Sequence, residues 1–149
     1  MKLPKELYNG CIIFLGIGFY FLLMEAVGFA DLFYLRLLNI LFVFYGTNRT
    51  LKSNFKEGKI IFASNIASAL LTSVTGVILS IVGLITYSFA KGGDLYVQSL
   101  SKTFLFGGNP SVMTYSISLL FEGIVSAVIV SFILILYWET RYASDKHSN

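Results

Sequence analysis

Residues 60–90 read IIFASNIASALLTSVTGVILSIVGLITYSFA, a stretch of thirty-one residues without a formal charge. An α-helix rises about 1.5 Å per residue, so this stretch would form a helix roughly 46 Å long. The hydrocarbon core of a bilayer is about 30 Å thick. The stretch therefore predicts a transmembrane helix that projects from the membrane at one end.

Small side chains recur along one face of this predicted helix, at alternating spacings of four and three residues. Small residues let helix backbones approach closely in a membrane and gain dispersion contacts. We therefore predict that this face packs against the other helices, and that a second small face in the last apolar stretch meets it. The first face comprises Ala69, Ser73, Gly76, Ser80 and Gly83, and the second Gly123, Ala127 and Ser131.

The composition is that of a membrane protein. Of the 149 residues, 56% are hydrophobic and 13% are charged, whereas about a quarter of the residues in a soluble domain are charged. The single cysteine, Cys11, excludes an internal disulfide and a cysteine-rich metal site. The net charge of +3 comes without a basic cluster interleaved with aromatics, which argues against nucleic-acid binding.

Apolar stretches and their breaks predict an all-α integral membrane protein with four transmembrane helices. The second is short and polar for a span, and its assignment depends partly on the topology. The segment 94–105 is either a short interfacial helix with Leu95, Tyr96, Leu100 and Phe104 on its apolar side, or a loop. The predicted helices are 7–29, 32–46, 60–90 and 112–138, in a transmembrane domain of residues 1–142 followed by a polar cytoplasmic tail, 143–149.

The distribution of Lys and Arg predicts the orientation. With four spans, eight of these residues lie on one side of the membrane and three on the other. The positive-inside rule then places both termini and the connector 46–59 in the cytoplasm. We expect the basic residues of this connector to contact anionic lipid headgroups. These residues are Arg49, Lys52, Lys56 and Lys59.

The sequence contains none of the common catalytic or metal-binding motifs. We therefore expect neither an enzyme nor a bound metal or cofactor. Polar residues inside predicted spans are costly and become the functional candidates. Glu25 and Arg36 each lie about 6 Å from the outer end of the first hairpin. They could form an ion pair that fixes the hairpin, extend separately to water, or form a site for an external ligand.

Glu122 is predicted to lie about 15 Å inside the fourth helix, close to the membrane midplane. No basic residue is predicted at that depth, so desolvation should favour its neutral form. Asn39, Thr72 and Ser73 reach similar levels. The carboxyl group is then either a hydrogen-bonding contact between helices or a proton- or cation-linked site.

Two short motifs, Glu25-Ala-Val-Gly28-Phe-Ala-Asp31 and Phe55-Lys-Glu-Gly58, close the first hairpin and lead into the long helix. In this layout the chain resembles an uncharacterised family of small four-helix bacterial inner-membrane proteins, known as a domain of unknown function. The segment 91–111 is shorter and less acidic than in that family. The resemblance implies a multi-pass protein of the bacterial inner membrane, without a known activity.

These observations lead to two functional hypotheses. The first is a non-enzymatic accessory or scaffold subunit that associates with membrane lipids and with a membrane-protein partner or further copies of itself. The alternative is a small oligomeric transporter or channel in which Glu122 couples a proton or cation. A transporter should have a polar path past Glu122, whereas a scaffold should have a dry bundle.

Overall fold

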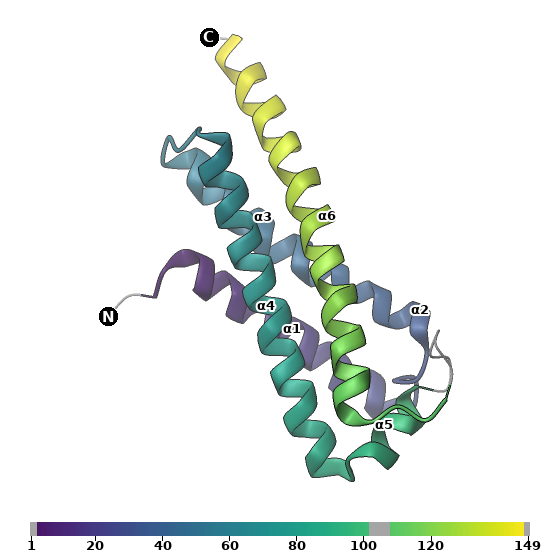
Figure 1. Cartoon of the computed structure of the whole chain (residues 1–149). Coiled ribbons are helices and arrows are strands. Elements are labelled where there is room, and N and C mark those ends of the chain that lie inside the picture. The colour runs from purple at the N-terminus through teal and green to yellow at the C-terminus, as the bar shows by residue number, and fades with distance from the viewer. Residues whose placement is uncertain (1–2, 102–107, 148–149) are drawn as a thin grey trace.

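The computed structural model describes residues 3–101 and 108–147, and all regular secondary structure in this part is helical. Long helices run in alternating directions, and short elements join two of them (Figure 1). The elements are α1 (Lys5–Ala26), α2 (Phe33–Arg36), the 3₁₀ turn η1 (Leu37–Asn39), α3 (Ile40–Lys56), α4 (Phe62–Lys91), α5 (Asp94–Leu100) and α6 (Val112–His147).

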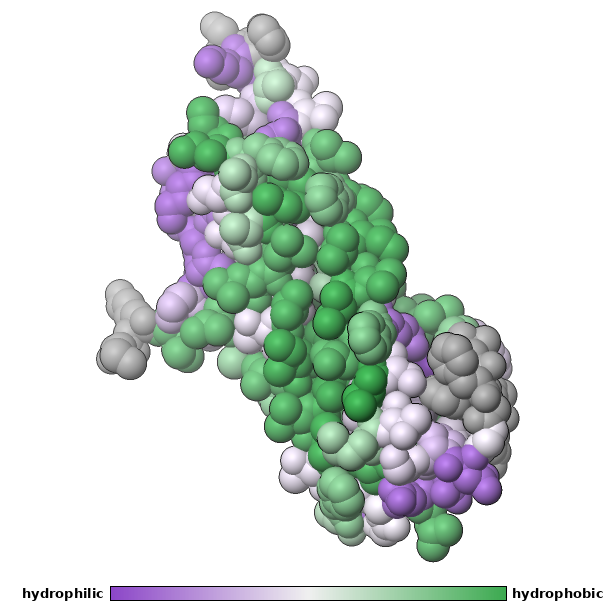
Figure 2. All heavy atoms as spheres, viewed as in Figure 1, coloured by the Kyte–Doolittle hydropathy of each residue, from purple (hydrophilic) through white to green (hydrophobic). Residues whose placement is uncertain are grey.

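Three of the described helices, α1, α4 and α6, are long and apolar enough to cross a membrane. On the face shown in Figure 2, hydrophobic residues extend along the molecule and hydrophilic residues gather towards its ends. This distribution suits a protein whose middle lies in lipid, and it supports a membrane protein.

Helix α4 packs between α1 and α6, as its small side chains require. Ala69, Ser73 and Gly76 are buried, and a Cβ atom added at Gly76 would lie 2.6 Å from the Cβ atom of Ile13 in α1. At Gly123 of α6, an added Cβ atom would lie 2.6 Å from a methyl carbon of Val77. The backbones therefore approach where a larger side chain would separate them.

The prediction of a connector at 46–59 is wrong, because α3 continues through most of this segment to Lys56. One face of this helix is buried and contains Thr47, Thr50, Leu51, Asn54 and Phe55. The four basic residues at 49, 52, 56 and 59 are exposed. The buried polar side chains can enter the bundle because neighbouring helices supply hydrogen-bond partners, such as Asn65 for Asn54 at 2.9 Å.

The chain preceding α3 is not one regular helix. The single turn of α2 passes into η1 before α3 begins at Ile40. Beside this change of helix type, Tyr20 of α1 donates a hydrogen bond to the carbonyl oxygen of Leu35 at 2.9 Å. The first hairpin is therefore held by a side-chain contact to the backbone.

Ionic and aromatic contacts join three segments at one end of the bundle. Lys5 and Lys59 lie 2.8 and 3.0 Å from Glu57, so the start of α1 meets the turn between α3 and α4. Hydrogen bonds from Lys5, Lys59 and Ser53 hold the pKa of Glu57 at about 2, below its usual 4.5. Trp138 donates a hydrogen bond to Asn48, which brings α6 to the same end.

The short helix α5 covers part of the opposite end. Gly92 and Gly93 have positive φ angles and end α4, as the paired glycines predict. Helix α5 lies within the segment 94–105, and its predicted apolar side is right at Leu100, which is buried, and at Tyr96, which packs partly buried against the same cluster. It is wrong at Leu95, which is 78% exposed, and it omits the buried Val97. Residues 102–105 of that segment, including Phe104, lie outside the described residues. The main-chain N–H of Val112 donates to Asp94, which thereby caps α6.

Helix α6 is longer than predicted. It extends to His147 instead of ending near Trp138, so it runs through the boundary placed between residues 142 and 143. At about 1.5 Å per residue it would be roughly 54 Å long. Its last turns extend past the neighbouring helices (Figure 1), and the side chains at 140–146 are exposed.

Candidate functional site

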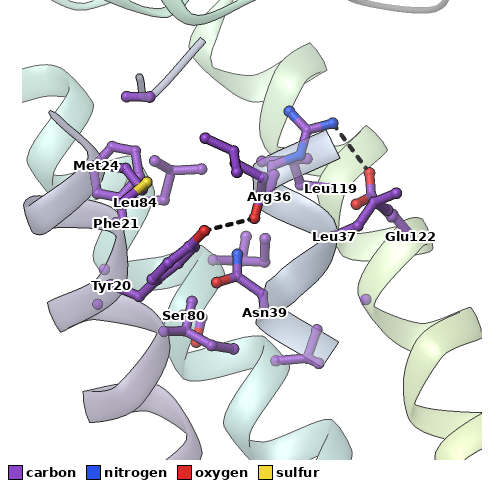
Figure 3. A pocket seen from close by; sticks show the side chains of 18 of the residues that line it. Tyr20, Phe21, Met24, Arg36, Leu37, Asn39, Ser80, Leu84, Leu119 and Glu122 are labelled. Carbon is purple, nitrogen blue, oxygen red and sulfur yellow. Dashed lines mark hydrogen bonds and ion pairs between the residues drawn. The ribbon is translucent and has the colours of Figure 1, made fainter. Parts of the chain in front are cut away.

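A cavity of about 520 Å³ lies between α1, the α2–η1 segment, α4 and α6. Aliphatic and aromatic side chains form most of its wall, and a small number of polar groups lie among them (Figure 3). This combination of size and lining is typical of small-molecule sites. The polar residues in the wall are Tyr20, Arg36, Asn39, Ser80, Tyr87, Tyr115, Glu122 and Ser126.

Arg36 and Glu122 form an ion pair at the wall of the cavity. The Nη2 atom of Arg36 lies 3.3 Å from Oε2 of Glu122, and its Nη1 atom donates to the Tyr115 hydroxyl at 3.0 Å. Figure 3 shows the two charged side chains reaching towards each other from neighbouring elements. The expectation that Glu122 lacks a cationic neighbour is therefore wrong, and with it the reason for a neutral carboxyl.

The predicted ion pair of Glu25 with Arg36 at the first hairpin is also wrong. Tyr87 and Tyr96 each donate a hydrogen bond to the Glu25 carboxylate, and Lys91 lies 3.8 Å from it. Because these partners come from α4 and α5, Glu25 fixes α1 to the elements that follow the hairpin. The sequence placed Glu25 and Arg36 at similar depths but could not show the direction in which each side chain points.

Two buried polar atoms at the cavity wall have no hydrogen-bond partner. They are Nε of Arg36, a donor, and Oδ1 of Asn39, an acceptor. The Asn39 side chain points to the side of the cavity on which Tyr20 lies (Figure 3). Buried polar groups in proteins are nearly always hydrogen-bonded, so these two atoms are exceptions to that rule.

Thr72 and Ser73 do not join Glu122, although the sequence placed them at a similar level. The Thr72 hydroxyl lies 2.9 Å from that of Thr50, which accepts a hydrogen bond from Asn9 at 2.9 Å. Ser73 lies 3.3 Å from Ser131, so that contact joins the two small faces. A second polar network therefore lies inside the bundle, apart from the cavity.

An apolar layer separates this network from the cavity. Ile13 is completely buried between Gly46 and Gly76. On α1, α3 and α4, a residue of the polar network is followed about one helical turn further on by a residue of this layer, and after about one more turn by a residue of the cavity wall. The series are Asn9, Ile13 and Ile17 on α1, Thr50, Gly46 and Val43 on α3, and Thr72, Gly76 and Ser80 on α4.

The small faces continue from this layer to the cavity. Ala69, Ser73, Gly76 and Ala127 are buried. Ser80, Gly83 and Gly123 are partly buried and line the cavity. Small side chains thus allow close helix contact over part of α4 and leave space over the rest.

The basic side chains of the predicted headgroup site have different neighbours. The Arg49 guanidinium lies 5.8 Å from the centre of the Tyr8 ring, and Lys59 pairs with Glu57. Lys52 and Lys56 line a second hollow of about 400 Å³, together with Arg141 and several aromatic side chains. Cationic and aromatic groups therefore meet at this end of the bundle.

Among the described residues, no group of three or more His, Cys, Asp or Glu could hold a metal ion. Comparisons with protein-family models, curated proteins and solved structures found no match to the chain. The likeness to the family of small inner-membrane proteins stays a prediction.

Proposed function

We propose that this chain is a multi-pass membrane protein that binds a small amphiphilic molecule in the cavity beside Arg36 and Glu122. The observation that carries the proposal is the cavity itself, whose apolar wall holds a few convergent polar groups. The irregular α2–η1 segment forms part of that wall, and broken helices often form ligand sites in membrane proteins. The proposed activity is binding.

Filling the cavity tests this proposal. An added Cβ atom at Gly18 meets no atom within 4 Å, and Gly18 lines the cavity. We expect Gly18→Phe to weaken the binding of monopalmitoylglycerol about tenfold or more, because the ring occupies the ligand volume while a tenfold loss requires only about 1.4 kcal/mol. Binding is measured by native mass spectrometry of the protein in detergent.

The matched control is Leu15→Phe, which adds the same ring at an exposed position of α1 outside the cavity. It should bind the probe like the unsubstituted protein. Equal binding by the Gly18→Phe and Leu15→Phe variants would contradict the assignment of the cavity as the binding site. Thermal unfolding of both variants would show whether either loss reflects misfolding.

We further propose four membrane crossings, with the chain through α2, η1 and α3 as the second. The alternating direction of α1, α3, α4 and α6 supports this count (Figure 1). With the excess of Lys and Arg inside, both termini and the α3–α4 turn would face the cytoplasm of a bacterial inner membrane. Lys52, Lys56 and Arg141 would then lie at the level of anionic lipid headgroups.

Cysteine labelling tests this orientation. In a Cys11→Ser background, we expect Leu95→Cys to react with a membrane-impermeant maleimide in intact cells, because Leu95 is exposed on α5. Lys56→Cys should react only after permeabilisation, since it lies at the opposite end of the bundle. Labelling of Lys56→Cys in intact cells would contradict the proposed orientation.

Association is a second candidate function. The last turns of α6 extend past the neighbouring helices and expose the side chains at 140–146. Such a helix offers a surface to a membrane-protein partner or to a second copy, as an accessory subunit requires. The mass of the complex in mild detergent would test this candidate, and a mass of one chain with its detergent would contradict stable association.

A further inference from the structure

The hollow of about 400 Å³ between α3 and α6 carries an excess of positive charge. Lys52 and Lys56 line it from α3, and Arg141 lines it from α6. Asp145 is the acidic residue among the described residues of its wall, so two positive charges remain in excess. A ligand with an anionic group would compensate this charge, whereas a neutral or cationic ligand would not.

Aromatic side chains of the hollow position the Arg141 guanidinium. The guanidinium carbon lies 5.7 Å from the centre of the Trp138 ring, and Nη1 donates to the Tyr137 hydroxyl at 2.8 Å. Trp138 is itself held by stacking on Phe55, with ring centres 5.9 Å apart, and by its hydrogen bond to Asn48. An arginine carries five N–H donors in a planar fork that matches two phosphate oxygens, so it can keep the contact with Tyr137 and bind an anion as well.

Exposed apolar side chains continue from the hollow towards the middle of the bundle. On α6, Tyr137, Ile133 and Ile129 recur at four-residue spacing, and each is about half exposed. On α3, the exposed Phe44 lies eight residues before Lys52, a rise of about 12 Å along the helix. A ligand with hydrocarbon chains would cover these side chains, whereas a small soluble anion would leave them uncovered.

We propose, on the basis of the proposed membrane crossings, that this hollow binds the phosphate group of an anionic membrane phospholipid. Lys52, Lys56 and Arg141 bind the phosphate oxygens, and the acyl chains lie along the exposed side of α6. Basic pockets between transmembrane helices bind lipid head groups in this way. Arg49 lies outside the hollow, beside Tyr8, so a general attraction of basic residues to the membrane would involve it and this site does not.

Two phospholipids with the same acyl chains test the charge of the head group. Dioleoyl phosphatidylglycerol and dioleoyl phosphatidylcholine are each titrated against the full chain in detergent by native mass spectrometry. Both contain a phosphodiester, but phosphatidylcholine also brings a cationic choline group to the cations of the hollow. We expect phosphatidylglycerol to bind about tenfold more tightly. Glycerol 3-phosphate has the phosphate without acyl chains and should bind more weakly than phosphatidylglycerol by about tenfold or more.

Variants that remove one charge show which residues form the site. Lys52→Gln and Lys56→Gln should each weaken the binding of phosphatidylglycerol about fivefold. Arg141→Gln should weaken it about tenfold, and Arg141→Lys should recover only part of that loss, because the planar fork is missing. Arg49→Gln is the matched control, since it removes a charge from α3 outside the hollow, and it should change binding less than about twofold. All four side chains are exposed, so thermal unfolding should stay close to that of the unsubstituted protein.

Tryptophan fluorescence locates the bound lipid. Trp138 is the single tryptophan of the chain, and it lines the hollow. Phosphatidylglycerol with brominated acyl chains should therefore quench the fluorescence, and the same lipid without bromine should reverse the quenching. Quenching should be weaker in Lys52→Gln and Lys56→Gln than in Arg49→Gln.

Equal binding of the two phospholipids, or equal losses in Arg49→Gln and Lys52→Gln, would overturn the site. Binding of glycerol 3-phosphate as tight as that of phosphatidylglycerol would overturn the lipid as the ligand and indicate a soluble phosphate ester. These measurements are made in detergent and at the hollow, so they depend neither on the orientation tested by cysteine labelling nor on the cavity tested by Gly18→Phe. Failure of the phosphate site would therefore leave both parts of the proposed function to their own tests.

Discussion

Arg36→Gln and Glu122→Gln are each expected to destabilise the protein by about 2 kcal/mol, and the double variant should lose clearly less than the sum of the two. Each single change leaves the opposite charge without its partner. The two side chains are 20% and 35% exposed, so the loss should be smaller than the roughly 3–5 kcal/mol of a fully buried pair. Thermal unfolding of the three variants in one detergent measures the coupling.

A second cycle with Glu25→Gln and Arg36→Gln is the control. Glu25 contacts tyrosines of α4 and α5, whereas Arg36 contacts α6. Their losses should therefore add within about 0.5 kcal/mol. Coupling of Arg36 with Glu25 in place of Glu122 would show that the first hairpin is held by an ion pair after all.

Gly46→Ala and Gly76→Ala are each expected to cost about 2 kcal/mol, because both force a methyl group against Ile13 in a packed core. The added Cβ atom would lie 2.4 Å from Cγ1 of Ile13 at Gly46 and 2.6 Å from its Cβ atom at Gly76. Gly76→Leu should cost more than the alanine change. Gly18→Ala, which meets no neighbour within 4 Å, should be neutral or stabilising by about 0.5–1 kcal/mol.

Combining these changes with Ile13→Ala distinguishes the two contacts. Truncation to alanine removes both Ile13 atoms that the Cβ atom of Gly46→Ala would meet, Cγ1 and Cδ1. At Gly76→Ala it removes Cγ2 but keeps Cβ, each 2.6 Å from the added atom, so it relieves that clash only in part. We therefore expect losses clearly less than additive for Ile13→Ala with Gly46→Ala, and closer to additive with Gly76→Ala. The same coupling for both pairs would contradict the position of Ile13 in the layer.

The helical class and the central position of α4 follow from the sequence, because long uncharged stretches and regularly spaced small residues have few other structural solutions. The continuation of α3 was missed, although its pattern was present. Arg49, Lys52 and Lys56 recur at three- and four-residue spacing, which places them on one face of α3, and Lys59 follows in the turn after the helix. The high charge of this segment suggested a loop. The opposite face of α3 is buried against other helices, and the local sequence does not show those contacts.

The sequence predicted individual residues of the candidate site but not how they are arranged. Arg36, Asn39 and Glu122 stand out because polar groups are costly inside a membrane. Their arrangement could not be predicted, since the contact between Arg36 and Glu122 joins residues far apart in the sequence and depends on the irregular α2–η1 segment. Tyr115 gave no signal, because an aromatic residue in an apolar helix is most often a packing residue.

The apolar layer around Ile13 has an electrical consequence. In a membrane that carries a potential, the voltage falls mainly across the regions that polarise least. A layer about one side chain thick, between a polar network and a pocket that holds an ion pair, would take a large share of that fall. An elementary charge crossing the full potential gains or loses about 2.3 kcal/mol per 100 mV. A buried apolar side chain such as Ile13 would therefore oppose the passage of an ion between the network and the pocket.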